Sequence, residues 1–105
     1  MSAHLLEQWR LASTFKDRLG SCYQLAGQAV VDDKGDLIHG SIQGEDNPRI
    51  GHAWVDTGEG IYAPVIDKDL PYDFWIRFAK PIEEVRYTKT EAMIQMLRSK
   101  HWGPW

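Results

Sequence analysis

The first third of the chain has hydrophobic residues at the three- and four-residue spacing of amphipathic helices. In the first stretch these residues are Leu5, Leu6, Trp9, Ala12 and Phe15. Gly20 favours a helix end, because glycine takes the left-handed backbone conformation without a steric penalty. Ser21 is a suitable N-cap for a second helix that starts at Cys22. The pattern therefore predicts an N-terminal helix pair, with Cys22 in the first turn of the second helix.

After a polar turn the pattern changes to short, β-rich stretches bounded by glycine and acidic residues. We expect strands over 37–42, 50–55, 60–66 and 82–87. Pro64 indicates that the third strand lies at an edge or contains a bulge, since proline cannot donate to a strand ladder. These stretches together predict a small antiparallel sheet.

Two further helices are predicted in the second half of the chain. One covers 71–78, with Asp69 as its cap and Pro71 tolerated in its first turn. The other opens with a capping box formed by Thr88 and Glu91, and it ends near residue 100.

The aromatic tail 101–105 is expected to pack back onto the domain. The predicted fold is α+β, with an antiparallel sheet of three to five strands, an N-terminal helix pair and a C-terminal helix. The chain has 105 residues, 43% of them hydrophobic and 26% charged, which suits one compact domain over 1–105.

The composition also bears on the cellular compartment and on the partners that we expect for this chain. No stretch approaches the ~20 apolar residues that a membrane-spanning helix needs, and the charged N-terminus is unlike a secretory signal. The single cysteine is typical of a reducing compartment, so we expect a cytoplasmic protein. A net charge of −3 argues against nucleic acid as a partner.

Cys22 and His52 best fit a catalytic pair. A helix N-terminus supplies partial positive charge and free N–H groups, which lower the pKa of a thiol. A nucleophilic thiol also needs an imidazole that accepts its proton and returns it to the leaving group. Cys22 stands at a predicted helix start and His52 in a predicted strand, so folding must bring them together. A lone cysteine in a small domain can equally be a buried apolar residue.

Two short stretches resemble known cysteine enzymes. Residues 21–26, with the sequence SCYQLA, and 52–56, with the sequence HAWVD, resemble the core of the papain-like and transglutaminase-like cysteine superfamily. The resemblance implies a cysteine-peptidase-like domain in which Cys22 is the nucleophile and His52 the base, with no cofactor. The chain from about residue 21 onward is also similar to small phage and bacterial proteins, a likeness that implies no particular activity.

One position departs from the superfamily pattern. After the tyrosine of the strand that follows the histidine, transglutaminase-like members carry an aspartate that orients the imidazole, and here that position is Ala63. Asp67 is then the acidic residue expected to orient His52, with Asn47 or Gln43 as uncharged substitutes. Loss of the orienting carboxylate costs up to ~10⁴-fold in the best-studied serine triad.

The sequence therefore predicts a small thiol-dependent hydrolase or acyl transferase that acts on a peptide or protein substrate. The backbone N–H of Cys22 is expected to hold the oxyanion. The side chains expected to bind the substrate or the oxyanion are Gln24, Gln43, His39 and Trp54.

Three other functions fit parts of the sequence. A catalytically inactive binding module on the same scaffold, acting as a phage protein on a host factor, is favoured by Ala63. An NAD-dependent ADP-ribosyltransferase of the H-Y-E class is suggested by the likeness of His-Gly-Ser at 39–41 to the first motif of that class, followed by Tyr62 and Glu83 or Glu84.

The third alternative is a metal site formed by Cys22, His39 and His52, since zinc accepts thiolate and imidazole ligands. None of the usual paired ligand spacings occurs in the sequence, so we expect no metal.

Overall fold

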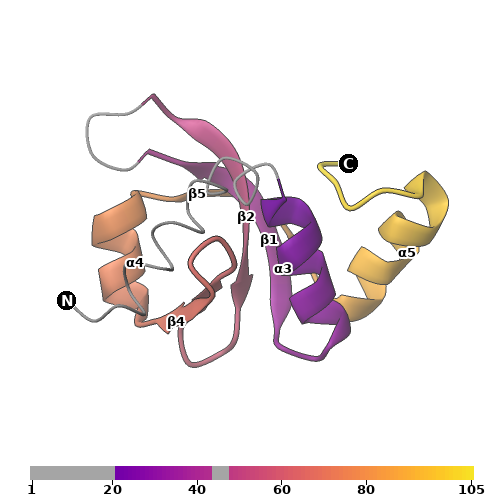
Figure 1. The fold of residues 1–105 in the computed structure, drawn as a ribbon, viewed down its shortest axis with the longest axis horizontal. Coiled ribbons are helices and arrows are strands. Elements are labelled where there is room, and N and C mark those ends of the chain that lie inside the picture. The colour runs from indigo at the N-terminus through magenta and orange to yellow at the C-terminus, as the bar shows by residue number, and fades with distance from the viewer. Residues whose placement is uncertain (1–20, 44–47) are drawn as a thin grey trace, which may run out of the picture.

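The chain folds around a five-stranded antiparallel sheet with helices packed on both faces (Figure 1). The computed structural model describes residues 21–43 and 48–105. The strand order is β4-β3-β2-β1-β5. The strands are β1 (Asp36–Ile42), β2 (Ile50–Asp56), β3 (Ile61–Ala63), β4 (Lys68–Leu70) and β5 (Ile82–Tyr87). The helices are α3 (Cys22–Val31), α4 (Tyr72–Ala79) and α5 (Lys89–Ser99). The α+β class and the antiparallel sheet are therefore confirmed.

The predicted N-terminal helix pair and the predicted C-terminal helix can be compared with this fold. The first helix of the predicted N-terminal pair lies outside the described residues, whereas α3 begins at Cys22 as expected. Ser21 occupies the N-cap position of α3, but its side chain makes no capping hydrogen bond. The C-terminal helix α5 opens with the predicted capping box of Thr88 and Glu91. None of the described helices is long and apolar enough to cross a membrane.

The predicted third strand is shorter than expected. β3 stops just before Pro64, the chain turns, and it returns as β4, which takes the edge of the sheet. Asp67 sits in this turn with a left-handed backbone, at φ 52°. Asp69 lies in β4 opposite Tyr62, so it does not cap α4, and the N-cap position of that helix is Pro71. Proline cannot donate to the ladder, which explains why the strand ends where it does.

The two faces of the sheet carry separate hydrophobic cores. On the side of α3 and α5, here called the α3 face, the core residues are Cys22, Ala26, Val30, Leu37, Ala53, Val55, Val65 and Ala92. On the side of α4, here called the α4 face, they are Ile38, Trp54, Ile61, Ala63, Trp75 and Ala79. Successive side chains of a strand point to opposite faces. Each position of β1 and β2 therefore belongs to one core only.

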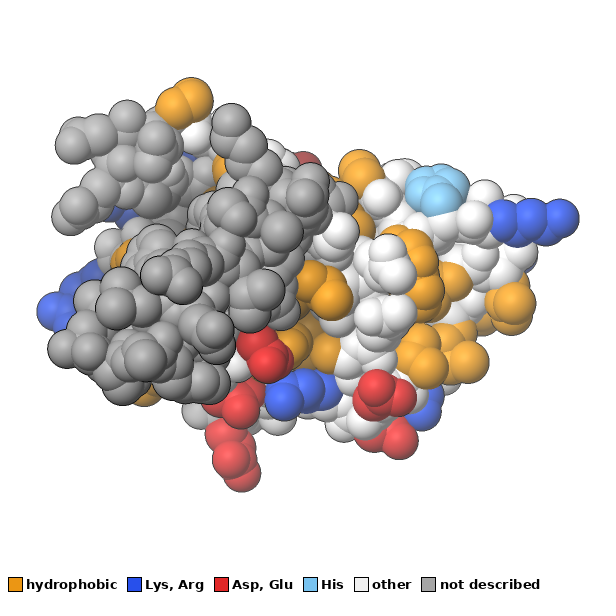
Figure 2. All heavy atoms as spheres, in the orientation of Figure 1, with side chains coloured by type: hydrophobic (Ala, Val, Ile, Leu, Met, Phe, Trp, Pro, Cys, Tyr) orange, Lys and Arg blue, Asp and Glu red, His pale blue; other side chains and the backbone are white. Residues whose placement is uncertain are grey.

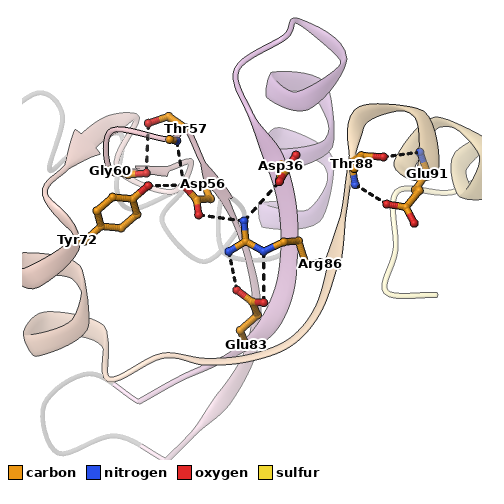
Figure 3. Close-up of polar contacts among 10 residues, drawn as sticks. Asp36, Asp56, Thr57, Gly60, Tyr72, Glu83, Arg86, Thr88 and Glu91 are labelled. Atoms are coloured by element: carbon orange, nitrogen blue, oxygen red, sulfur yellow. Dashed lines mark hydrogen bonds and ion pairs between the residues drawn. The ribbon is translucent and has the colours of Figure 1, made fainter.

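A network of ion pairs on the α4 face joins three strands (Figure 3). The guanidinium of Arg86 on β5 lies 3.0 Å from Asp56 Oδ2, 3.4 Å from Asp36 Oδ2 and 2.9 Å from Glu83 Oε1. The Tyr72 hydroxyl donates to Asp56 Oδ1 at 2.6 Å. Burial alone would raise the pKa of Asp56, and its hydrogen bonds, led by that from Tyr72, lower it. The network ties α4 and β5 to the end of β2.

The last residues of the sequence lie across the α3 face. After α5, which ends at a left-handed Lys100, residues 101–105 turn back toward the first turn of α3 (Figure 1); we call them the strap. Within the strap, the indole N–H of Trp105 donates to the His101 carbonyl oxygen at 3.0 Å. The Gly103 N–H donates to His101 Nδ1 at 3.1 Å. Trp105 packs against the α3-face core, as the sequence predicts for this tail.

Candidate functional site

Cys22 lies in the first turn of α3 with 1% of its surface exposed. Burial raises the pKa of its thiol, while backbone hydrogen bonds from Ala53, Tyr23 and Cys22 itself act in the opposite direction. Backbone N–H groups stabilise a thiolate over a thiol. The sulfur therefore faces donors that suit a thiolate, but the closed structure keeps it away from water.

His52 lies on the other side of the sheet. Its ring centroid is 6.2 Å from that of Trp54 and 6.4 Å from that of Trp75, and both tryptophans belong to the α4-face core. The next residue, Ala53, packs with Cys22 in the α3-face core. Because neighbouring side chains of a strand point to opposite faces, the backbone of β2 separates the His52 ring from the sulfur. The structure does not bring Cys22 and His52 together, and the predicted pair is corrected accordingly.

His39 is the buried histidine that shares a face with Cys22. It is the partner of Ala53 in the β1–β2 register, and the Ala53 backbone in turn contacts the Cys22 thiol. The His39 ring packs edge-to-face against Tyr23, the residue after Cys22, with 4.9 Å between centroids. Directly opposite residues of an antiparallel pair lie on one face with their Cβ atoms about 5 Å apart. Sulfur and imidazole therefore lie in the same core.

The His39 ring has no polar partner in this core. Only 4% of His39 is exposed, and neither ring nitrogen has a hydrogen-bond partner within the described part of the chain. Burial lowers the pKa of His39 from 6.5 to about 4, so the ring is neutral at pH 7 and one of its nitrogens carries a lone pair that can accept a hydrogen bond. A buried polar group without a partner costs folding free energy, typically about 1–3 kcal/mol. Such a group is a candidate for a functional role.

The other predicted site residues lie away from the Cys22 thiol. Asp67 accepts a hydrogen bond from the Tyr62 hydroxyl at 2.6 Å, and His52 Nδ1 has no partner among the residues described. Asp67 therefore does not orient His52. Gln24 and Gln43 are both exposed.

Trp54, predicted to bind substrate, belongs to the α4-face core instead. It is two positions after His52 in β2, and residues two apart in a strand point to the same face. Gln43, on the same side of the molecule, donates its backbone N–H to the Ala79 carbonyl oxygen of α4 at 2.8 Å. Asn47, the other uncharged candidate for orienting His52, lies outside the described residues.

The residues predicted for an H-Y-E transferase site and for a metal site do not all lie on one face of the sheet. Glu83, one candidate for the last H-Y-E residue, is paired with Arg86 on the α4 face, whereas His39 points to the α3 face. For a metal site, the three predicted ligands are divided between the two faces, with His52 apart from Cys22 and His39. Within 21–43 and 48–105 no group of three metal-ligating side chains converges.

An open pocket of about 560 Å³ lies at another part of the surface. Its lining comprises Lys34, Thr57, Glu59, Gly60, Asp69, Leu70 and Pro71. This lining contains neither a thiol nor an imidazole, so the pocket adds no chemistry to the buried site.

Comparison of the chain with protein-family models, with curated proteins and with solved structures gives no match. The likeness to the papain-like and transglutaminase-like superfamily therefore stays a prediction from the residues quoted above.

His39 is predicted from the sequence as a substrate-binding residue, but its position on the same face of the sheet as Cys22 is not. The available signal is parity, because His39 and Leu37 are two positions apart in one strand and must share a face. Leu37 identifies that face only once it is known to pack against α3. The motif likeness instead pointed to the histidine on the neighbouring strand.

Proposed function

We propose that this chain is a small thiol-dependent hydrolase or acyl transferase, with Cys22 as the nucleophile and His39 as the base. The observation that carries the proposal is the buried imidazole of His39, which has no hydrogen-bond partner among the described residues and lies on the same sheet face as the Cys22 thiol. The motif likeness supports the role of Cys22. The side-chain parity of β1 and β2 moves the role of base from His52 to His39.

The chemistry would begin with transfer of the thiol proton to a ring nitrogen of His39. The thiolate sulfur attacks the carbonyl carbon of an ester or amide, and the electron pair of the C=O bond moves to the oxygen. Collapse of this intermediate expels the leaving alcohol or amine, which takes the proton from His39. Water or an amine then attacks the resulting thioester, returns its proton through His39 to the sulfur, and releases the acid or the new amide.

The oxyanion would be held by backbone N–H groups at the start of α3 and on the neighbouring strand β2. The N–H groups that lower the pKa of the thiol come from Ala53, Tyr23 and Cys22. Donors already in place stabilise developing charge without reorganisation, and one such donor is typically worth about 3–4 kcal/mol. No glutamine side chain is needed for this role, in keeping with the exposed positions of Gln24 and Gln43.

The two buried histidines provide a matched test of the proposal. Acetylation of Cys22 by p-nitrophenyl acetate is followed by mass spectrometry of the full-length protein and of its His39→Phe and His52→Phe variants. Phenylalanine keeps a ring in each core but removes the basic nitrogen. We expect His39→Phe to slow acetylation about 100-fold, the usual minimum contribution of a positioned base, and His52→Phe to change it less than about 3-fold.

A Cys22→Ala variant supplies the background rate, and circular dichroism confirms that each variant is folded. Where His39→Phe lowers the thermal midpoint, His39→Gln is measured beside it at a temperature where both are native. Equal rates for the two histidine variants would overturn the role of His39. Acetylation at other residues only, with Cys22 unmodified in the wild type, would overturn the role of the thiol.

A binding module without turnover is the second candidate function. The specific observation behind it is the closed thiol, because burial raises the pKa of Cys22 in a site where 1% of the residue is exposed. This function predicts that Cys22→Ser keeps full biological effect, whereas an enzyme loses it. Ala63, at the position where the superfamily carries an orienting aspartate, agrees with either candidate once His39 replaces His52 as the base.

A further inference from the structure

The strap covers the Cys22–His39 site with a tryptophan. The Trp105 ring lies 5.0 Å from the His39 ring and 5.1 Å from the Tyr87 ring, centroid to centroid. Tyr23 closes another side of His39 at 4.9 Å, and Tyr87 lies 5.3 Å from His39. These separations are those of favourable aromatic pairs. Trp105 therefore packs against His39 and Tyr87, and the neighbouring rings of Tyr23, His39 and Tyr87 are here called the aromatic box.

Two glycines allow the strap to lie this close. A Cβ on Gly103 would lie 2.6 Å from His39 Cε1, and its φ of 110° is one that side-chain-bearing residues rarely adopt. A Cβ on Gly27 of α3 would lie 2.7 Å from Trp102 Cε3. The strap thus follows the surface at van der Waals distance on both sides of the site. Its fit depends on the absence of side chains at these two positions.

His39, which forms one wall of the aromatic box, is also the proposed catalytic base. His39 contributes its ring to the box and its nitrogens to the proposed chemistry, so a group bound in the box lies beside the reacting sulfur and imidazole. Figure 2 shows exposed hydrophobic side chains among polar and backbone atoms over α3 and α5. On α5 the exposed hydrophobic residues include Ile94 and Leu97. The surroundings of the box therefore favour an apolar ligand over a charged one.

We propose that the aromatic box is the subsite for an aromatic side chain of a peptide substrate, and that Trp105 occupies it in cis as an autoinhibitory plug. The substrate class rests on the proposed function, whereas the closure of the box by Trp105 rests on the contacts of the strap. The strap must leave before a substrate reaches Cys22. A peptide that carries an aromatic residue takes the place of Trp105 and so opens the site to itself.

The plug is tested on the full-length chain by the rate at which iodoacetamide alkylates Cys22, followed by intact mass. Trp105→Ala empties the box, and Gly103→Ala pushes the strap off His39. We expect each variant to alkylate about 10-fold faster than the wild type, since a site that opens locally reacts in proportion to its open population. Phe78→Ala removes an exposed aromatic residue of α4 and serves as the matched control, with an unchanged rate.

Ligand binding is tested by adding the capped tetrapeptide Trp-Gly-Pro-Trp to the Trp105→Ala variant. We expect this peptide to slow alkylation toward the wild-type rate, and the same peptide with alanine in place of both tryptophans to have no effect. Wild-type alkylation rates in both strap variants, with circular dichroism showing them folded, would overturn the plug. Equal protection by the two peptides would overturn the aromatic specificity.

The same measurement separates the plug from the proposed catalysis. Alkylation reports access to the sulfur, so the increase caused by Trp105→Ala should persist when His39→Phe is combined with it. Faster alkylation without acetylation that depends on His39 would leave the plug standing and remove the enzyme. Unchanged alkylation together with acetylation that depends on His39 would support the enzyme and overturn the plug.

Discussion

The two faces of the sheet each bury one histidine, and the two histidines are alike in exposure and in the effect of burial on their pKa. His39 and His52 are 4% and 3% exposed, and burial lowers the pKa of each from 6.5 to about 4. On the α4 face His52 is surrounded by the rings of Trp54 and Trp75. On the α3 face His39 shares its core with a thiol.

This comparison teaches that burial and an altered pKa do not by themselves identify a catalytic histidine. Both rings meet those two criteria, which are expected at active sites, yet the Cys22 thiol lies on one face only. Which histidine could act on the thiol depends on which one shares its sheet face, and the alternation of side chains along the strands decides that. A histidine at position 53 in place of position 52 would face α3, and it would then share the face of the Cys22 thiol.

The largest expected loss of unfolding free energy comes from filling the space above Gly40, on the α4 face. A Cβ on Gly40 of β1 would overlap the Ile82 carbonyl oxygen and lie 2.9 Å from Trp54 Cη2 on the α4 face. Because a backbone carbonyl cannot turn aside as a side chain can, we expect Gly40→Ala to cost about 3 kcal/mol of unfolding free energy. Urea denaturation at pH 7 measures this loss.

The matched substitution on the α3 face is Gly27→Ala. Its Cβ would lie 2.7 Å from Trp102 Cε3 and 2.9 Å from Met96 Cε, both at the ends of side chains that can move. Alanine also stabilises a helix by about 1 kcal/mol relative to glycine. We therefore expect a change in unfolding free energy within about 1 kcal/mol, together with faster alkylation of Cys22. A loss as large as that of Gly40→Ala would show that the strap is as rigid as the sheet.

Local sequence patterns were enough to predict most of the described elements of the fold. The start of α3 at Cys22, the strands β1, β2 and β5, and the Thr88 capping box all depend on residues within a few positions of one another. The turn after β3 was missed, because Pro64 predicts an edge strand or a bulge, whereas the chain reverses there and β4 pairs with β3 at the edge of the sheet.

The site could not be predicted in the same way, because parity is a tertiary property. Residues 52–55 of β2 are all buried, so hydrophobicity does not alternate there and does not show which side chains face α3. The residues between β1 and β2 are too many for a two-residue turn that would fix the register. Whether Cys22 meets His39 or His52 therefore depends on which face α3 covers.

The pH dependence of stability should be shared equally by the two faces. Both histidines are neutral in the folded protein and take up a proton near pH 6.5 when it unfolds, so the unfolded state binds more protons between about pH 4 and 6.5. Unfolding free energy therefore falls as the pH is lowered through this window and is fully present above it. A difference of 2.5 pKa units corresponds to at most about 3 kcal/mol for each histidine.

Urea denaturation between pH 7 and pH 5 tests this equality with the variants used above. We expect His39→Phe and His52→Phe each to remove about half of the pH dependence, and the double variant to remove most of it. The carboxylates with lowered pKa values, Asp56 and Glu91, titrate below this range and leave the comparison undisturbed. A pH dependence that only one variant reduces would mean that the other histidine is less enclosed than its exposure indicates.

The smallest expected effect is on α5, the helix that carries the strap. The Thr88 hydroxyl accepts the Glu91 N–H at 3.2 Å, and the Glu91 carboxylate accepts the Thr88 N–H at 3.0 Å (Figure 3). Loss of an N-cap side chain costs about 1 kcal/mol, so Thr88→Ala should reduce amide-exchange protection in α5 by about fivefold and leave the α4 face unchanged. Thr57→Ala, in the turn between β2 and β3, is the matched control because its hydroxyl bonds the Gly60 carbonyl oxygen at 3.2 Å. Because the strap follows α5 directly, alkylation of Cys22 should rise slightly in Thr88→Ala and not in Thr57→Ala. Equal loss of protection on both faces in Thr88→Ala would mean that the α3 face cannot open separately, and the plug would then have no local motion by which to leave.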